Sequence, residues 1–468
     1  MKLSLEQIAR WTGARLIAPP HCTASEATGY SIDTRTLAPG DLFFAIRGDR
    51  FDAHDFVHQA LEAGACAAVV SDSRIRGLLP DEHRHFLLVV EGDPLVALQT
   101  LAAAVRRRWG GRVVAVTGSA GKTTTKEAVA AVLAARFRVL KSKGNLNNHF
   151  GLPLQLLKLA PEDEVAVVEM GMSAAGEIAA LCRIAAPDWG IVTNVGNAHA
   201  EAFHDGIAGV ARAKYELVAG LSPNARERAI AFLNADDRYV AQFGRDFPGR
   251  AVYYAARPSA VAGVRAEMIE ERGAAGSRFR VITDYGSADV ELALLGRHNI
   301  LNALAAIAVG LEAGIPLAQC VEAIASLRPE DRRGELIEWQ GATLINDCYN
   351  SNPEALQSMI RTLAAVPATR RILVAGEMLE LGPRSAELHR ESGEAALAAG
   401  IDTVLGVRGL ARQIVAGAAG GSTEAIFVES PQEAGAWLRE HLRPGDAVLL
   451  KASRGVRLEQ ALATLTAP

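Results

Sequence analysis

The sequence has few cysteines, few aromatic residues and no long apolar run. Only 5 of its 468 residues are cysteines, and no Cys-x-x-Cys pair occurs. An odd number of scattered cysteines argues against a disulfide framework and favours reduced thiols in a cytoplasmic protein. The longest apolar stretch, residues 300–311, is much shorter than the roughly 20 residues that a membrane-spanning helix needs. Residues 1–16 lack the apolar core of a signal peptide and predict an amphipathic helix.

Neither sign of charge dominates the chain. It has 49 basic and 53 acidic residues, for a net charge of −4. This balance gives no reason to expect a nucleic-acid partner or an anionic membrane surface as a partner. Hydrophobic residues make up 49% and charged residues 22%, which is typical of a soluble folded protein. A chain of 468 residues is too long for one ordinary hydrophobic core, so we expect two to four domains. We also expect the protein to be a monomer.

The chain divides into three blocks by pattern. The first block, residues 1–91, joins short apolar runs by turn signals and predicts a small mixed α/β domain. Its expected strands are residues 42–46, 67–70 and 86–90, with a helix at 55–63. The second block, residues 92–326, alternates apolar strands with helices and predicts a parallel sheet covered on both faces. Its expected strands are 113–116, 165–170 and 191–195, its helices 94–109, 126–135, 177–184 and 298–313, and a β-rich stretch covers 252–294 with strands at 281–283 and 290–294.

The third block, residues 327–468, again alternates strands and helices. The pattern predicts a doubly wound, Rossmann-like domain. Its expected strands are 343–346, 371–375, 403–406, 425–428 and 447–450, and its helices are 353–365, 385–399, 410–418 and 432–441. Together the blocks predict an α/β protein of three domains, with a phosphate-binding loop in the central one.

That loop is the strongest local signal. An apolar strand runs into a glycine-rich turn and a helix start, with the sequence Thr117-Gly118-Ser119-Ala120-Gly121-Lys122-Thr123-Thr124. Glycines let backbone N–H groups turn toward a phosphate, and the helix N-terminus favours the anion. The usual P-loop has another glycine five residues before the glycine of the Gly-Lys pair. In this chain that position, five residues before Gly121, is Val116. The alternative is an ordinary glycine turn between a strand and a helix.

The short spacing of this loop resembles the ATP loop of the Mur ligase and folylpolyglutamate synthase superfamily. Further segments resemble that family in the same order along the chain, and they cover nearly all of it. They are Lys143-Gly144-Asn145-x-Asn147-Asn148, Val168-Glu169-Met170-Gly171, Thr193-Asn194-Val195-Gly196-x-Ala198-His199, Ala213-Lys214, Gly296-Arg297-His298-Asn299-x-x-Asn302, Asp347-x-Tyr349-Asn350 and Lys451-x-Ser453-Arg454-Gly455.

The resemblance implies an ATP-dependent ligase that forms an amide bond through an acyl phosphate. It implies three functional domains: residues 1–91 for a UDP-linked substrate, 92–326 for ATP, and 327–468 for the nucleotide and the incoming amine. The segment Gly376-Glu377-Met378-x-Glu380-Leu381-Gly382 resembles members that add D-alanyl-D-alanine to UDP-N-acetylmuramoyl-tripeptide. So does Tyr349-Asn350-Ser351-Asn352-Pro353, where other members tend to carry Tyr-x-His-x-Pro. A Mur ligase that adds a single amino acid, and a P-loop kinase or NTPase, remain as alternatives.

The reaction brings a triphosphate and a carboxylate together, so the site needs positive charge from Lys122 and from Mg²⁺. The expected metal ligands are Thr123, Glu169 at the end of a strand, and His199; a surface glutamate and a structural histidine are the alternatives. An ammonium group has no lone pair for a metal. The resemblance implies that Lys214 is carbamylated and so becomes an anionic ligand; a surface lysine paired with Glu216 is the alternative.

The remaining candidates face the substrates. The expected ATP contacts are Gly118, Ser119, Ala120, Gly121, Lys122, Thr123, Thr124, Asn299, Asn302, Arg333, Asp347 and Asn350. Arg332 competes with Arg333 for the phosphate-facing role, and helix capping or turn chemistry is the alternative for the asparagines and Asp347. The expected substrate contacts are Ser31, Asp33, Thr34, Arg35, Arg47 and Gly48 for UDP, and Asn147 and Asn148 in the substrate loop. Glu377 is expected at the amine end of the dipeptide or at the interface between domains. Lys451 and Arg454 are expected to bind the nucleotide or the dipeptide carboxylate. A tight surface turn is the alternative for the UDP contacts, and a surface basic pair is the alternative for Lys451 and Arg454.

Overall fold

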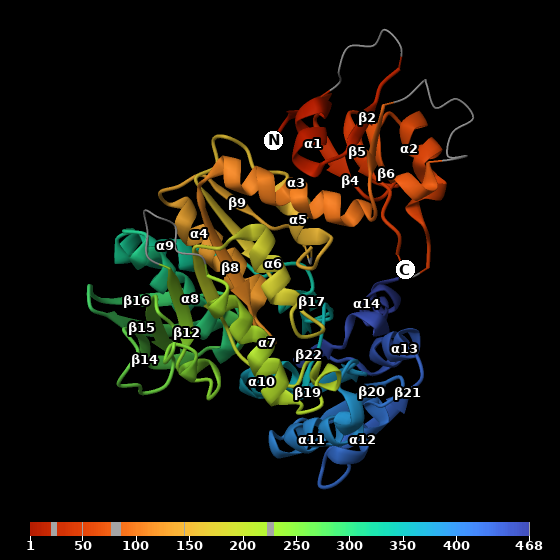
Figure 1. The fold of residues 1–468 in the computed structure, drawn as a ribbon. Coiled ribbons are helices and arrows are strands. Elements are labelled where there is room, and N and C mark those ends of the chain that lie inside the picture. Colours follow the sequence, from red (N-terminus) through yellow and green to blue (C-terminus); the bar gives the residue numbers. More distant parts are fainter. Residues whose placement is uncertain (20–25, 49, 76–85, 145, 222–228, 468) are drawn as a thin grey trace.

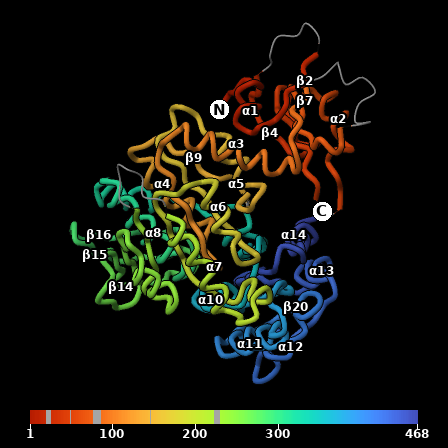
Figure 2. Tube along the Cα trace, viewed as in Figure 1, coloured from red at the N-terminus to blue at the C-terminus, as the bar shows by residue number. Residues whose placement is uncertain are grey.

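The computed structural model describes residues 1–19, 26–48, 50–75, 86–144, 146–221 and 229–467. Asn145, which was named above, and Cys22, one of the five cysteines, lie outside these ranges. The chain forms three lobes in sequence order, drawn from red to blue in Figure 1. Figure 2 follows the chain through these lobes, with the two termini in the first and the last of them. No helix among the described residues is long and apolar enough to cross a membrane.

The N-terminal lobe is a mixed five-stranded sheet with two helices. Its strand order is β2-β7-β6-β5-β4, and all neighbours are parallel except β2 and β7. The bounds are β2 (Arg15–Ile17), β4 (Gly29–Ser31), β5 (Asp41–Phe44), β6 (Ala67–Ser71), β7 (Leu87–Val90), α1 (Leu5–Thr12) and α2 (Val57–Glu62). The helix expected over residues 1–16 is shorter because the Ser4 side chain caps its start and left-handed Gly13 ends it.

The central lobe contains a nine-stranded sheet in the order β16-β15-β14-β13-β12-β11-β8-β10-β9. Neighbours from β9 to β14 are parallel, whereas β14, β15 and β16 form an antiparallel meander at one edge. The strands are β8 (Arg112–Thr117), β9 (Val139–Lys141), β10 (Val165–Glu169), β11 (Trp189–Val192), β12 (Ile230–Asn234), β13 (Arg250–Ala255), β14 (Val264–Glu271), β15 (Ser277–Thr283) and β16 (Gly286–Leu292). The β-rich stretch expected at 252–294 is this antiparallel edge of the otherwise parallel sheet, where alternating charged residues leave one face in water.

Helices cover both faces of the parallel part of this sheet. They are α3 (Pro94–Trp109), α4 (Lys122–Ala134), α5 (Gly151–Leu156), α6 (Glu177–Ala185), α7 (Ile207–Ala219), α8 (Arg297–Glu312) and α9 (Leu317–Ala325). Alternate residues of β8 belong to different cores: Val113 and Ala115 pack with α3 and α6, and Val114 and Val116 pack with α4 and α8. The first of these cores continues into the N-terminal lobe through α3 and α1, so the two lobes share one apolar core.

The C-terminal lobe has a six-stranded sheet in the order β17-β18-β22-β19-β20-β21, parallel except for β17. Helices α10, α11 and α12 pack on one face and α13 and α14 on the other. The elements are β17 (Glu335–Trp339), β18 (Ala342–Asn346), β19 (Arg370–Gly376), β20 (Thr403–Val407), β21 (Glu424–Val428), β22 (Asp446–Lys451), α10 (Pro353–Ala365), α11 (Ser385–Ala398), α12 (Ala411–Ala418), α13 (Pro431–His441) and α14 (Glu459–Thr466). The doubly wound prediction is confirmed.

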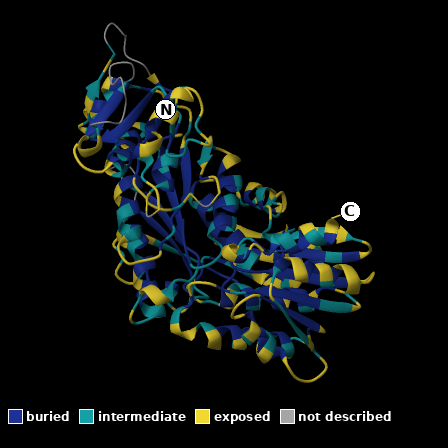
Figure 3. Ribbon diagram, turned by 90° about the vertical axis from the view of Figure 1, so that its right-hand side faces the viewer, coloured by how far each residue is buried: buried dark blue, intermediate teal, exposed yellow. Residues whose placement is uncertain are grey.

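The central strands of each sheet are buried, edge strands such as β16 and β17 are partly exposed, and the outer helix faces are exposed (Figure 3). Residue 91 lies between β7 and α3, and residue 327 lies between α9 and β17. We propose these two connections as the domain boundaries. The carboxyl ends of β8, β10 and β11 open toward the C-terminal lobe, which is where the candidate site lies.

Candidate active site

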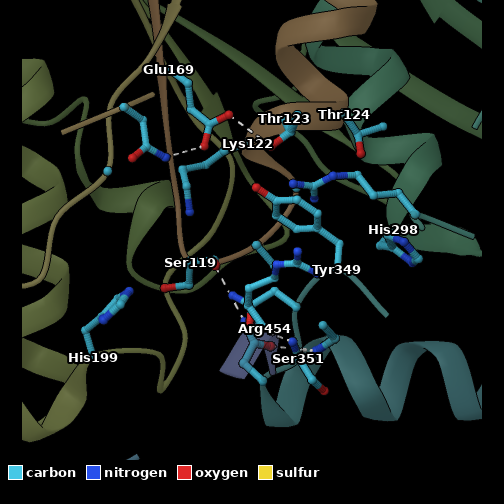
Figure 4. Close-up of a pocket in the computed structure, with 18 of the residues that line it drawn as sticks. Ser119, Lys122, Thr123, Thr124, Glu169, His199, His298, Tyr349, Ser351 and Arg454 are labelled. Carbon is cyan, nitrogen blue, oxygen red and sulfur yellow. Dashed lines mark hydrogen bonds between the residues drawn. The ribbon is translucent and has the colours of Figure 1, made fainter. Parts of the chain in front are cut away.

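A cavity of about 480 Å³ lies between the central and C-terminal lobes. Figure 4 shows side chains from both lobes pointing into it. Its lining includes most residues expected to bind ATP or a metal, and several expected to bind substrate. The first group is Ser119, Ala120, Gly121, Lys122, Thr123, Thr124, Glu169, His199, Lys214, Asn299, Arg333, Asp347 and Asn350, and the second is Asn147, Asn148, Lys451 and Arg454.

The phosphate loop joins β8 to α4 and needs both of its glycines. Gly118 and Gly121 have φ values of 154° and 78°, and Gly121 precedes the first turn of α4. A Cβ atom at Gly118 would lie 1.8 Å from Thr193 Oγ1, and one at Gly121 would lie 2.7 Å from Asn302 Oδ1. The loop is fixed from β11, because Asn194 Oδ1 accepts the Ala120 N–H at 2.9 Å. The helix therefore starts at Lys122, four residues before its expected start at 126.

Lys122 folds back over the loop. Its Nζ donates to the Gly118 carbonyl at 2.8 Å. Desolvation in the cavity lowers the pKa of Lys122; the Glu169 carboxylate opposes this shift, and the Arg333 guanidinium adds to it. Two cationic side chains thus converge on the space above the glycines, where a phosphate would carry the neutralising charge.

Glu169 ends β10 and is only 2% exposed. Its Oε2 accepts the Thr123 hydroxyl at 2.9 Å, and its Oε1 accepts Asn147 Nδ2 at 2.7 Å. A buried carboxylate beside a threonine hydroxyl offers the hard oxygen ligands that a divalent cation such as Mg²⁺ takes. Among the described residues, no group of three or more His, Cys, Asp and Glu side chains converges as a metal site.

Lys214, on α7, is 2% exposed, and its side-chain amine makes no hydrogen bond or ion pair with any other described residue. Burial lowers the pKa of this amine well below its usual range, and the charge of Lys122 lowers it further. The alternative of a surface lysine paired with Glu216 is wrong. The Glu216 carboxylate instead accepts the N–H groups of Gly176 and Ala179, at 2.7 and 2.9 Å, where α6 begins.

His199 lies in the loop after β11 and also lines the cavity. Its Nδ1 is 2.8 Å from Glu380 Oε2 of the C-terminal lobe. His298, at the start of α8, lines the opposite side, and its Nδ1 is 2.9 Å from Ser358 Oγ. Desolvation lowers the pKa of His298 to about 4, although the nearby Asp347 carboxylate opposes the shift.

The two arginines between the lobes point to different partners. The Arg333 guanidinium stacks over the Tyr349 ring at 3.9 Å and lines the cavity. Arg332 donates to Glu459 Oε1 at 3.0 Å and is not part of the lining. Arg333 is therefore the arginine that faces the phosphate loop. Lys451 bonds Asp347 Oδ2 at 2.5 Å and the Asn350 carbonyl at 2.9 Å, so it organises the loop that carries both.

Three protein-family models match the chain. The Mur ligase family catalytic domain matches residues 26–143, the Mur ligase middle domain residues 116–310, and the glutamate ligase domain of Mur ligases residues 332–454. The chain is 41% identical, over 376 residues and 80% of each chain, to UDP-N-acetylmuramoyl-tripeptide–D-alanyl-D-alanine ligase of Escherichia coli. The chain belongs to the Mur ligase family.

Further relatives of this Mur ligase cover nearly its whole length. The Bacillus subtilis ligase of the same name is 34% identical over 471 residues, covering 99% of this chain and 98% of its own. A crystal structure of MurF from Acinetobacter baumannii superposes with a TM-score of 0.88 at 28% identity, covering 99% of both chains. MurF of Thermotoga maritima in complex with ADP gives 0.81 at 29% identity, covering 94% of this chain and 97% of its own.

Three predicted contacts of the Mur ligase lie outside the lining of the cavity: Gly118, Asn302 and Glu377. The Gly118 carbonyl instead accepts Lys122 Nζ. Asn302 does not line the cavity; its Oδ1 accepts the Thr125 hydroxyl at 3.0 Å, and its Nδ2 donates to Asn299 Oδ1 at 2.8 Å. Through the second of these hydrogen bonds, Asn302 holds the side chain of Asn299, which does line the cavity. Glu377 is also outside the lining, because its carboxylate accepts the Leu410 N–H at 3.0 Å. Glu380, three residues further along the same loop and not predicted as a contact from the sequence, lines the cavity instead.

The candidate UDP contacts lie apart from the cavity, in the N-terminal lobe. Ser31 ends β4, and Thr34 lies in the turn that follows it, between Asp33 and Arg35. The Arg35 side chain is hydrogen-bonded to Asp33 and holds the pKa of that carboxyl below its usual range. Arg47 forms an antiparallel bridge with Asp52, and the Gly48 N–H donates to the Phe51 carbonyl at 2.9 Å. Both groups of residues follow neighbouring parallel strands, so they lie at the same edge of the sheet.

Proposed function

We propose that this Mur ligase joins D-alanyl-D-alanine to the terminal carboxylate of UDP-N-acetylmuramoyl-tripeptide, with ATP consumed to ADP and phosphate, in peptidoglycan precursor synthesis. Two observations agree and together carry the proposal. The chain is similar over nearly its whole length to ligases of this name, and its cavity gathers Lys122, Glu169 and Arg333 around the phosphate loop. Sequence likeness supports the substrates, and the cavity supports the chemistry.

The chemistry follows from the charges in the cavity. A carboxylate is a poor electrophile, so one of its oxygens first takes the terminal phosphoryl group of ATP, which forms an acyl phosphate and releases ADP. The amine of the dipeptide then attacks the carbonyl carbon, the C–O bond to phosphate breaks, and the amine loses a proton. Lys122 and Arg333 stabilise the negative charge that builds up as the phosphoryl group passes between two anions.

Thr123 and Glu169 would hold Mg²⁺, which neutralises phosphate charge when bound. For Lys214 we propose carbamylation: its neutral amine adds CO₂ and loses a proton, which turns a buried cation into an anionic oxygen ligand. The burial of this amine, its lack of a described counter-ion and the nearby charge of Lys122 support the modification. Histidine at 199 would complete the metal ligands on the other side.

The substrates divide among the lobes in this proposal. The UDP group would bind the turns of the N-terminal lobe around Asp33 and Arg47, with Asn147 and Asn148 facing the peptide. Arg454, which is half-exposed at the cavity rim, would bind the dipeptide carboxylate. Because a single chain supplies every candidate contact, we propose a monomer. The described cysteines 66, 182, 320 and 348 are all free, which supports a cytoplasmic location.

Phosphate release tests the proposal. The purified chain is incubated with ATP, Mg²⁺ and UDP-N-acetylmuramoyl-tripeptide, and then separately with D-alanyl-D-alanine, with single amino acids, or with no amine. We expect steady release only with the dipeptide. Equal release with a single amino acid would instead favour a single-amino-acid ligase, and equal release with no amine would favour a kinase or NTPase.

A further inference from the structure

Two loops from different lobes meet at the edge of the cavity. One is the segment 196–203 after β11, and the other is the segment 377–384 after β19. Their closest polar contact joins His199 Nδ1 to Glu380 Oε2 at 2.8 Å. Both residues have left-handed backbone conformations, with φ values of 62° and 63°. Non-glycine residues in this region are uncommon and persist where their surroundings hold them in place.

Other contacts hold the loop that carries His199 on the C-terminal lobe without involving the imidazole. Glu354 Oε1, in the first turn of α10, accepts the Asn197 N–H at 2.9 Å and Asn197 Nδ2 at 2.7 Å. A Cβ atom at Gly382 would lie 2.6 Å from Glu201 Cβ, so the backbones approach closely. The loop that carries His199 is therefore docked on the C-terminal lobe at several points.

The loop that carries Glu380 is itself held firmly. The Met378 N–H donates to Nε2 of the buried His389 at 2.8 Å, and the Leu379 N–H donates to Ser453 Oγ at 3.0 Å. These bonds fix the backbone on the two residues before Glu380. The carboxylate is thus presented to His199 from a rigid support.

We propose that Glu380 is a positioning residue for His199. Because a carboxylate can only accept, Nδ1 must carry the proton of this hydrogen bond, and the neutral ring then keeps its lone pair on Nε2. In Figure 4 the ring of His199 points from its loop into the cavity, on the side of Ser119. A histidine that ligates a metal usually donates its other ring N–H to a carboxylate or carbonyl, which fixes the tautomer and the ring orientation.

The consequence is a link between lobe docking and the cation site. His199 belongs to the central lobe and Glu380 to the C-terminal lobe, so the imidazole is oriented only when the lobes are docked. This inference rests on the proposed role of His199 as a metal ligand. His199, Glu169 and Lys214 line the same cavity.

Mn²⁺ binding to the full chain, with a non-hydrolysable ATP analogue present, tests the inference by electron paramagnetic resonance. We expect Glu380→Ala to weaken the affinity for Mn²⁺ about 10-fold or more. Glu380→Asp should weaken it less. The matched control is Glu354→Gln, which removes charge from the other docking contact of the same loop without touching the ring, and it should leave the affinity unchanged. Unchanged or tighter binding in Glu380→Ala overturns the inference, as does unchanged binding in His199→Ala.

A second measurement reports the tautomer directly. Nitrogen-15 spectra of histidine-labelled protein, assigned with His199→Ala, should show a protonated Nδ1 in the unsubstituted chain and a mixture of tautomers in Glu380→Ala. The same tautomer in both would overturn the inference. Dipeptide-dependent phosphate release by the unsubstituted chain is measured in parallel, so a failure of the proposed function is seen separately.

Discussion

The Thr123 hydroxyl donates to Glu169 Oε2 across 2.9 Å, which joins the first turn of α4 to the end of β10. These residues are 46 positions apart in the chain, and they meet because β8 and β10 are parallel neighbours in the sheet. The carboxyl ends of such strands share one edge, so the acid at the end of β10 lies beside the phosphate loop that follows β8. The pair is where phosphate binding and cation binding would meet.

Glu169→Gln should reduce kcat by at least about 100-fold. The amide keeps the hydrogen bond from Thr123 but loses the charge that a divalent cation needs. Steady-state phosphate release and the Mg²⁺ concentration for half-maximal rate measure the effect. Glu270→Gln, at an exposed position on β14, is the control and should behave like the unsubstituted chain. Normal Mg²⁺ dependence in Glu169→Gln would remove this carboxylate from the metal site.

Lys214→Ala should abolish turnover, and short carboxylates such as acetate should restore part of it without added bicarbonate. The removed side chain leaves a buried space in which a small carboxylate can replace the carbamate. Lys214→Arg is the comparison, because a guanidinium stays charged and does not add CO₂. Turnover that survives in Lys214→Ala would contradict the carbamate role.

The unsubstituted chain should also depend on dissolved CO₂. Since the pKa of Lys214 is lowered in the folded protein, the neutral amine that reacts with CO₂ is present at lower pH than for an exposed lysine. Activity should therefore fall after removal of CO₂ and return with bicarbonate at neutral pH. Equal activity in CO₂-free and bicarbonate buffers would argue against the modification.

Gly121→Ala should abolish binding of an ATP analogue while the chain stays folded. The added Cβ would lie 2.7 Å from Asn302 Oδ1, at a backbone φ of 78° that alanine disfavours. Isothermal calorimetry measures binding, and circular dichroism checks the fold. Gly176→Ala has a similar φ of 84° but open space around its Cβ, so it serves as the control for backbone strain alone. Equal affinity in both variants would contradict the steric account.

Arg106→Ala should lower the free energy of unfolding by about 3–5 kcal/mol. The Arg106 side chain is 7% exposed and pairs with Asp188 at 2.9 Å; its Nε also donates to the Ala185 carbonyl at 2.8 Å. Its loss leaves a buried carboxylate without this partner. Urea denaturation measures the change, and the exposed Arg107→Ala is the control on the same helix. A loss below about 1 kcal/mol would mean that water replaces the guanidinium.

The local sequence pattern was sufficient to predict much of the secondary structure. Helices α3 and α10 begin and end where expected, because each has a capping side chain followed by proline: Asp93 with Pro94, and Asn352 with Pro353. The phosphate loop was likewise found from its strand, glycines and lysine. The antiparallel direction of the strands at one edge of the central sheet was not predicted, because strand direction depends on connections that the apolar pattern does not record.

The contacts between lobes could not be predicted. Glu377 and Glu380 are three residues apart in one loop, and nothing local shows that Glu380 reaches His199, 181 positions earlier, while Glu377 bonds Leu410. The choice between Arg332 and Arg333 also needed the structure, since it depends on which side chain meets Tyr349 and which meets Glu459. Non-local partners of this kind follow from the assembled fold.

The central claim is that ATP activates the tripeptide carboxylate for capture by the dipeptide, and oxygen-18 transfer tests it most directly. UDP-N-acetylmuramoyl-tripeptide labelled with oxygen-18 in its terminal carboxylate is supplied with ATP, Mg²⁺ and D-alanyl-D-alanine. We expect each phosphate released to carry one oxygen-18 atom, because an acyl phosphate leaves a carboxylate oxygen on phosphorus. Phosphate released without label during dipeptide-dependent turnover would contradict the account.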